Sequence, residues 1–119
     1  MFVHLRLHTE FSVVDGATRV DDMVAAAARD QQPALAITDL GNLFGAIKFY
    51  KAARGAGVKP LIGAEVLLEG RDAEADAPSR VLLLATGTPG YLNLSELLAR
   101  AWTRGVVKAQ AVVRRDWLA

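Results

Sequence analysis

A short apolar run, Ala34 to Ile37, constrains the fold of this chain more than any other feature. Its residues do not alternate between apolar and polar, which is typical of a strand that is buried on both faces of a sheet. The flanking segments have helical spacing instead. Apolar residues recur before the run at Val20, Met23, Val24, Ala27 and Ala28, and residues 43–56 form a second helical segment after it. A buried strand between two helices predicts a parallel sheet with covering helices.

The first part of the chain carries two further signals of secondary structure. Residues 2–7 alternate between apolar and polar, which predicts a strand with one polar face. Thr18 to Asp21 is similar to a capping box and predicts the start of the helix that follows. Gly57 is the expected stop of the second helix.

The rest of the chain continues the same pattern. Strands are predicted at residues 59–68 and 80–85, with a hydrophilic loop over 69–79. A helix opens at Pro89 and ends at Gly105, and Asp116 is placed to cap another helix. The order of elements predicts an α/β fold, which is either a small open sheet or the N-terminal half of a (β/α) barrel.

Composition narrows the class of protein. The 119 residues match one domain, and the net charge of +1 gives no strong global field toward nucleic acid or membrane. There is no cysteine, so disulfides and thiolate metal sites are excluded. No apolar run approaches the roughly 20 residues of a membrane span, and the N-terminus lacks the layout of a signal peptide. We expect a cytoplasmic protein, or a piece of one.

Polar side chains follow the predicted strands at the points where catalytic loops of α/β folds converge. His8 and the loop carboxylates Glu10 and Asp15 follow the first strand, Asp39 follows the second, and Glu65 lies within the third. Imidazole and carboxylate groups that converge there would suit zinc, manganese or magnesium.

These residues also have a purely structural interpretation, which the spacing alone leaves open. Asp15-Gly16 is a favourable turn, Asp39 is placed to cap the next helix, and Glu65 has arginines to pair with.

Four sequence motifs together resemble one known family. These motifs are HLRLHTEFSVVDG, AITDLGNLFGAIKFYKAA, KPLIGAEV and GYLNLSELLARAWTRG. They are similar to the PHP (polymerase and histidinol phosphatase) domain, and in particular to the PHP domains of bacterial DNA polymerase III alpha subunits. The resemblance implies that residues 1–119 are a partial PHP domain. It also implies the N-terminal part of a distorted (β/α)7 barrel, with mostly parallel strands and covering helices, and a polymerase core that is absent here.

The resemblance also implies positions for metal ligands. Metal-binding PHP domains carry His-x-His, Thr-Asp-His-Gly and Gly-x-Glu on their first three strands. His8, Asp15 and Glu65 match ligand positions, and Asp39 lies in the second motif. Two positions depart from the pattern, because Arg6 and Leu40 stand where the family has histidines; the list of vestigial metal-site positions is therefore Arg6, His8, Asp15, Asp39, Leu40 and Glu65.

Arg6 opposes a metal at this place. A guanidinium is cationic at any physiological pH and offers no lone pair. At about 5 Å from a divalent ion, and an effective dielectric near 20, the repulsion costs roughly 6–7 kcal/mol. We therefore predict a vestigial site in which Arg6 forms an ion pair with Asp15 or Glu65 and no metal binds. If any ion is held, its ligands would be His8, Asp15 and Glu65.

The resemblance implies a role within a larger enzyme. The full-length protein would be a DNA-directed DNA polymerase with Mg²⁺ in its polymerase core. This segment would be non-catalytic, without a cofactor of its own, supporting the polymerase and docking a proofreading exonuclease subunit of the epsilon type. The full-length protein would also bind other replicase subunits and DNA. The alternative is an active metal-dependent phosphoesterase or 3′–5′ exonuclease. As an incomplete barrel, the segment is also expected to dimerise.

Two groups of basic residues stay open to interpretation. Lys48, Lys51 and Arg54 are spaced along one predicted helix, and Arg114-Arg115 lies near Trp117. Either group could contact nucleic-acid phosphates. Otherwise the first is a solvated helix face and the second is part of a frayed terminus.

Overall fold

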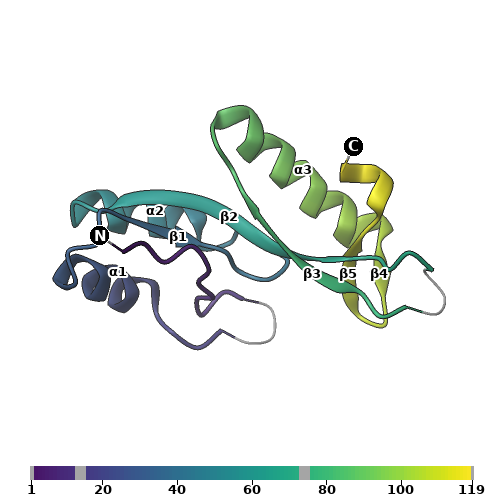
Figure 1. Ribbon diagram of the computed structural model, residues 1–119, viewed down its shortest axis with the longest axis horizontal. Helices are drawn as coiled ribbons and strands as arrows, with labels where there is room; N and C mark the ends of the chain where they lie inside the picture. Colours follow the sequence, from purple (N-terminus) through teal and green to yellow (C-terminus); the bar gives the residue numbers. More distant parts are fainter. Residues whose placement is uncertain (1, 13–15, 73–75, 119) are drawn as a thin grey trace.

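The computed structural model describes residues 2–12, 16–72 and 76–118. Its helices are α1 (Val20–Arg29), α2 (Ala46–Gly55) and α3 (Thr88–Arg104), with a terminal 3₁₀ helix, η1 (Arg115–Leu118). Its strands are β1 (Ala34–Ile37), β2 (Lys59–Leu68), β3 (Ser79–Leu84), β4 (Val106–Val107) and β5 (Gln110–Val113). Figure 1 shows β2 running between two parts of the molecule, with α1, α2 and β1 at one end and α3, β4 and β5 at the other.

The sheet is organised around β2. β1 pairs in parallel with its first half, from Ala34 opposite Lys59 to Ile37 opposite Ile62. β5 pairs in parallel with its last residues, and β3 returns antiparallel to its second half. β4 and β5 form a hairpin. The α/β class and the parallel pairings follow the prediction. The described residues between β2 and β3 contain no helix, and a direct return of the chain of this kind gives an antiparallel pair.

Two apolar cores lie along β2. The first joins α1, α2 and β1, with residues Val20, Val24, Ala27, Leu35, Ile37, Phe49, Ala53 and Val58. The second joins β2, α3 and β5, with residues Ala64, Val66, Leu68, Leu94, Leu98, Ala101 and Val113. The apolar stripe predicted for the first helix therefore faces the first core through Val20, Val24 and Ala27, as burial of one apolar face requires.

The strand predicted at residues 2–7 is not a regular strand. The segment nevertheless lies along β1, because Ala36 N donates to His4 O at 3.1 Å and Thr38 N donates to Leu7 O at 2.9 Å. In return, Leu7 N donates to the Thr38 side-chain oxygen at 2.8 Å rather than to a backbone carbonyl. The Thr38 side chain takes the place of one backbone partner, so the pairing is irregular. Arg6 and His8 both reach Glu65, as their shared face predicts, but Leu5 of the expected apolar face is 48% exposed.

Three predicted boundaries also differ. α1 has Arg19 at its N-cap with no side-chain cap, so the capping box is wrong. α2 begins at Ala46 instead of residue 43, since the Asn42 side chain accepts a hydrogen bond from Phe44 N and holds a turn there. Asp116 lies inside η1 and does not cap a further helix.

The β4–β5 hairpin was not predicted. Its turn residues Lys108 and Ala109 have φ values of 50° and 64°. Hairpin turns of this kind normally carry Asn-Gly or Asp-Gly, which the sequence lacks here, so the usual signal is missing. No helix in the described part of the chain is long and apolar enough to cross a membrane.

Candidate functional site

Glu65 is the centre of the candidate site. Its side chain lies in the second half of β2, and the residue is only 4% exposed. Arg6 binds it with both ends of the guanidinium, Nε to Oε1 at 3.2 Å and Nη2 to Oε2 at 3.1 Å. His8 Nε2 lies 2.5 Å from Oε2, and Arg80 Nη1 lies 3.8 Å from the same oxygen. The ion pair predicted between Arg6 and Glu65 is therefore present.

The charge of Glu65 is set by these neighbours. Burial raises the pKa of its carboxyl group, but the hydrogen bonds and charges of Arg6 and His8 lower it by more, so the pKa falls below the ordinary value of 4.5. Glu65 is thus an ionised carboxylate at neutral pH, held in a buried position by cationic partners. The carboxylate therefore has charge-assisted hydrogen bonds to two side chains of the N-terminal segment.

Asp39 has a structural role close to this cluster. The residue is 1% exposed, and it accepts two hydrogen bonds from Thr9, from the backbone N at 2.5 Å and from Oγ1 at 2.6 Å. These bonds attach the turn after the N-terminal segment to the end of β1. Asp39 does not cap α2, whose N-cap is Gly45. Both carboxylate oxygens face Thr9, which was not singled out from the sequence.

Leu40 brings the second motif against the third. It forms an isolated parallel bridge with Glu65, in which Gly41 N donates to Glu65 O at 2.9 Å and Glu65 N donates to Asp39 O at 3.0 Å. The Leu40 side chain is buried, and its backbone N donates to Ser12 Oγ at 2.9 Å. Leu40, which stands where the family motif has a histidine, is thus the backbone neighbour of Glu65 across this bridge.

The structure thus brings together Arg6, His8 and Glu65, with Leu40 beside them. Asp15 lies outside the described residues. Glu10 lies apart from the cluster, in an exposed pair with Lys48 at 3.4 Å.

Arg80 was missed from the sequence. It lies on β3, diagonally across from Glu65, because Glu65 pairs with Leu82 in the β2–β3 register. A diagonal pair of this kind is predictable only once the register is known.

Among the described residues, no group of three or more His, Asp and Glu side chains is placed to hold a cation. His8 and Glu65 are the only two of the predicted ligands that meet within the described ranges, and Arg6 is bound to the same carboxylate. A guanidinium at hydrogen-bond distance from the main acidic ligand repels a divalent cation.

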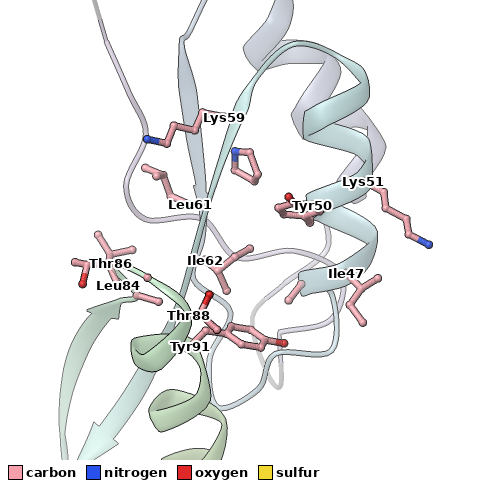
Figure 2. A pocket seen from close by; sticks show the side chains of 14 residues that line it. Ile47, Tyr50, Lys51, Lys59, Leu61, Ile62, Leu84, Thr86, Thr88 and Tyr91 are labelled. Carbon is pink, nitrogen blue, oxygen red and sulfur yellow. The ribbon is translucent and has the colours of Figure 1, made fainter.

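A separate apolar groove lies on the first half of β2. It has a volume of about 730 Å³ and lies between α2, β2 and the start of α3. Figure 2 shows Ile47 and Tyr50 reaching it from α2, Ile62 from β2, and Thr88 and Tyr91 from α3, with Lys51 and Lys59 at the rim. None of the predicted site residues lines it, so it is distinct from the Glu65 cluster.

Comparison with known protein families gives a match over nearly the whole chain. The PHP domain model matches residues 4–119. Among curated proteins, the chain is 49% identical over 118 residues to the DNA polymerase III subunit alpha of Pseudomonas aeruginosa. It is 43% identical over 117 residues to that of Escherichia coli K12, and 48% identical over 120 residues to that of Neisseria meningitidis. In each case 98% of this chain is covered, but it spans only about 10% of the relative's length.

Solved structures support the fold. An amidohydrolase from Chromobacterium violaceum, solved with bound sulfate and no metal, matches with a TM-score of 0.67 at 24% identity. A candidate metal-dependent phosphoesterase from Bifidobacterium adolescentis matches with a TM-score of 0.62 at 22% identity. Both matches cover 83% of this chain and 32% of the other, which is consistent with part of a (β/α) barrel.

Proposed function

Because the chain belongs to the PHP domain family, we propose that it serves as the PHP region of a replicative DNA polymerase of the DNA polymerase III alpha type. The identity of 43–49% to such subunits over 98% of the chain supports this assignment. DNA synthesis and the Mg²⁺ that it requires would belong to the rest of the polymerase, since the chain spans about a tenth of its relatives.

The proposed role of this region is structural rather than hydrolytic. One observation carries the proposal, namely the two-pronged contact of the Arg6 guanidinium with Glu65. Phosphoester hydrolysis by a metal pair needs two cations that clamp the attacking and leaving oxygens. In this site a fixed positive side chain binds the carboxylate instead, and it joins the N-terminal segment to β2. The former metal site would then hold the N-terminal segment against β2.

Metal content and hydrolysis test this role together. The purified chain is dialysed against Mn²⁺ or Zn²⁺ and analysed for bound metal, and it is assayed with single-stranded DNA and p-nitrophenyl phosphate. We expect less than one bound equivalent and no metal-dependent turnover. The double variant Arg6→His/Leu40→His should bind Mn²⁺ more tightly than the native chain. One tightly bound equivalent with turnover in the native chain would refute the proposal.

We further propose that the region docks a proofreading exonuclease subunit of the epsilon type and supports assembly with other replicase subunits. Family membership supports this role. Large apolar side chains on the surface support it too, among them Phe44, which is 78% exposed, and Ile47, which is 67% exposed. Co-purification of the tagged chain with an epsilon-type exonuclease is the direct test. If a longer polymerase that contains this chain also fails to retain the exonuclease, the docking role is wrong.

A second candidate function is metal-dependent phosphoester hydrolysis, including 3′–5′ exonuclease activity. The observation that favours it is the 2.5 Å approach of His8 Nε2 to Glu65 Oε2, since these are two ligand types that divalent metals use. The hydrolysis assay above separates the two functions. Activity that is lost in His8→Ala but kept in Arg6→Ala would establish this alternative.

A further inference from the structure

One local excess of positive charge lies near the end of the chain. The net charge is only +1, with 14 Lys and Arg residues against 13 acidic ones. Residues 99–118 nevertheless contain five of these cations and a single acid, Asp116; the cations are Arg100, Arg104, Lys108, Arg114 and Arg115. A local excess of one sign creates a surface potential that a nearly neutral total charge conceals.

The fold gathers part of this charge around one aromatic ring. The Arg100 guanidinium lies 5.5 Å from the centre of the Trp117 ring, and that of Arg114 lies 5.3 Å from it. Arg114 Nη2 also donates to Arg104 O at 3.5 Å, at the end of α3. Arg100 and Arg104 are four residues apart on α3 and so share one side of the helix. Arg100, Arg104 and Arg114 are called the basic cluster below.

Nearby acids neutralise this cluster only in part. Glu96 pairs with Arg100 at 3.1 Å on the helix surface, where such pairs are weak. Glu69 accepts a hydrogen bond from the backbone N of Arg115, which leaves the Arg115 guanidinium outside that contact. Within the described residues, the Glu96 pair is the only salt bridge that reaches the basic cluster. Arg104 and Arg114 are both exposed.

Two arginines on the Trp117 ring are more than the stability of η1 requires. One guanidinium on Trp117 would attach η1 to α3 by a cation–π contact. A second guanidinium on the same ring adds repulsion between like charges, at short range and near an apolar surface. A bound anion would remove this repulsion. The basic cluster is therefore better suited to bind an anion than to attach η1 to α3.

We propose that the basic cluster, with Lys108 and Arg115, binds the phosphodiester backbone of a nucleic acid. A linear polyanion has phosphates enough to contact cations on α3, at the β4–β5 turn and at η1, whereas an isolated phosphate reaches only one of these places. Binding is expected to be independent of base sequence, because contacts to phosphate oxygens carry no sequence information. This surface is separate from the Glu65 cluster, so the inference does not depend on the state of the metal site.

Fluorescence anisotropy of labelled DNA tests the proposal. An oligothymidylate and a duplex are each titrated with the native chain between about 50 and 200 mM salt. In Arg100→Ala/Arg114→Ala we expect about tenfold weaker binding and a salt slope that is shallower by about 1.4 for the single strand, as two lost phosphate contacts require. The two arms show whether the backbone is read from one strand or from a duplex.

A matched control removes the same charge elsewhere. Arg19 and Arg29 are exposed at the two ends of α1, which lies far from η1 in Figure 1. Arg19→Ala/Arg29→Ala should bind DNA within about twofold of the native chain. Equal weakening in both double variants would mean that only net charge matters, and would overturn the proposal.

Two further results would also overturn it. One is the absence of saturable binding by the native chain at about 50 mM salt. The other is equal competition by polyglutamate at the same charge concentration, which would indicate an acidic protein partner. If Arg100→Ala/Arg114→Ala does not fold by circular dichroism, the exposed pair Arg104→Gln/Arg114→Gln replaces it, and a loss of threefold or more is the expected result.

Discussion

The two halves of β2 border regions of opposite character. The second half carries Glu65, whose charge and hydrogen bonds are matched by Arg6 and His8. The first half, Lys59 to Ile62, borders the apolar groove, where Ile47 is 67% exposed and Tyr50 47% exposed. In the described residues, no buried side-chain nitrogen or oxygen lacks a hydrogen-bond partner. The buried polar side chains near this strand therefore all have hydrogen-bond partners, whereas some of the apolar side chains beside it stay exposed.

The difference shows which requirement can be met locally. A buried carboxylate needs a partner within hydrogen-bond distance, and one arginine from a neighbouring segment supplies it. Apolar side chains need a whole covering layer, which a single residue does not provide. We therefore expect changes at the polar end to affect unfolding and changes at the groove to affect association.

The largest effect is expected at Asp39. Asp39→Ala removes both acceptors of Thr9 and leaves the Thr9 donors buried, since Thr9 is 1% exposed. Loss of these bonds should lower the free energy of unfolding by about 3 kcal/mol. Urea denaturation measures this change. Asp22→Ala, on the exposed first turn of α1, is the matched control and should cost less than about 1 kcal/mol.

A somewhat smaller effect is expected at Arg6. Arg6→Ala leaves Glu65 buried with fewer cationic partners, but the Arg6 side chain is 56% exposed and His8 stays in place. We therefore expect a loss of about 2 kcal/mol, which is less than for a fully buried pair. A double-mutant cycle with Glu65→Gln should give a coupling of about 1 kcal/mol. A coupling near zero would show that the ion pair does not hold the N-terminal segment.

The pH dependence of stability tests the same pair without removing a side chain. The pKa of Glu65 is lower in the folded chain than its ordinary value of 4.5, so ionised Glu65 stabilises the folded state above that pH. This contribution should be lost as the pH falls from about 4.5 through the lower folded pKa. Thermal melts of the native chain and of Glu65→Gln should therefore converge in this acidic range. Parallel curves would contradict the assigned pKa shift.

The smallest effect on unfolding, but a clear one on association, is expected at the groove. We propose that the chain dimerises through its exposed apolar side chains. Strand-to-strand addition is blocked there, because Lys59 N faces β1 through its bond to Pro33 O, and Pro60 on the other edge has no N–H to donate. Ile47→Lys should leave unfolding within about 0.5 kcal/mol and reduce dimerisation in light scattering. A native chain that stays monomeric at high concentration would contradict this.

How far the sequence predicts the candidate site depends on the kind of contact. The departure at Arg6 from the family motif predicts an ion pair with Asp15 or Glu65, because a cationic residue replaces a histidine there, and the structure shows the pair with Glu65. The third strand is predicted at residues 59–68 and lies there, since a continuous apolar run with flanking turns is a local signal. Arg80 and Thr9 could not be predicted, because both depend on which segments are adjacent in space.

By itself, the sequence determined the order of most helices and strands, the PHP family, and the presence of Arg6 and Leu40 where the family motifs have histidines. These are properties of short segments and residue types. Only the tertiary structure decided that Asp39 binds Thr9, that Lys108 and Ala109 turn the β4–β5 hairpin, and that two arginines meet on Trp117. The physical reason is that hydrogen-bond and charge partners are chosen by distance in space, and register and chain crossings set that distance.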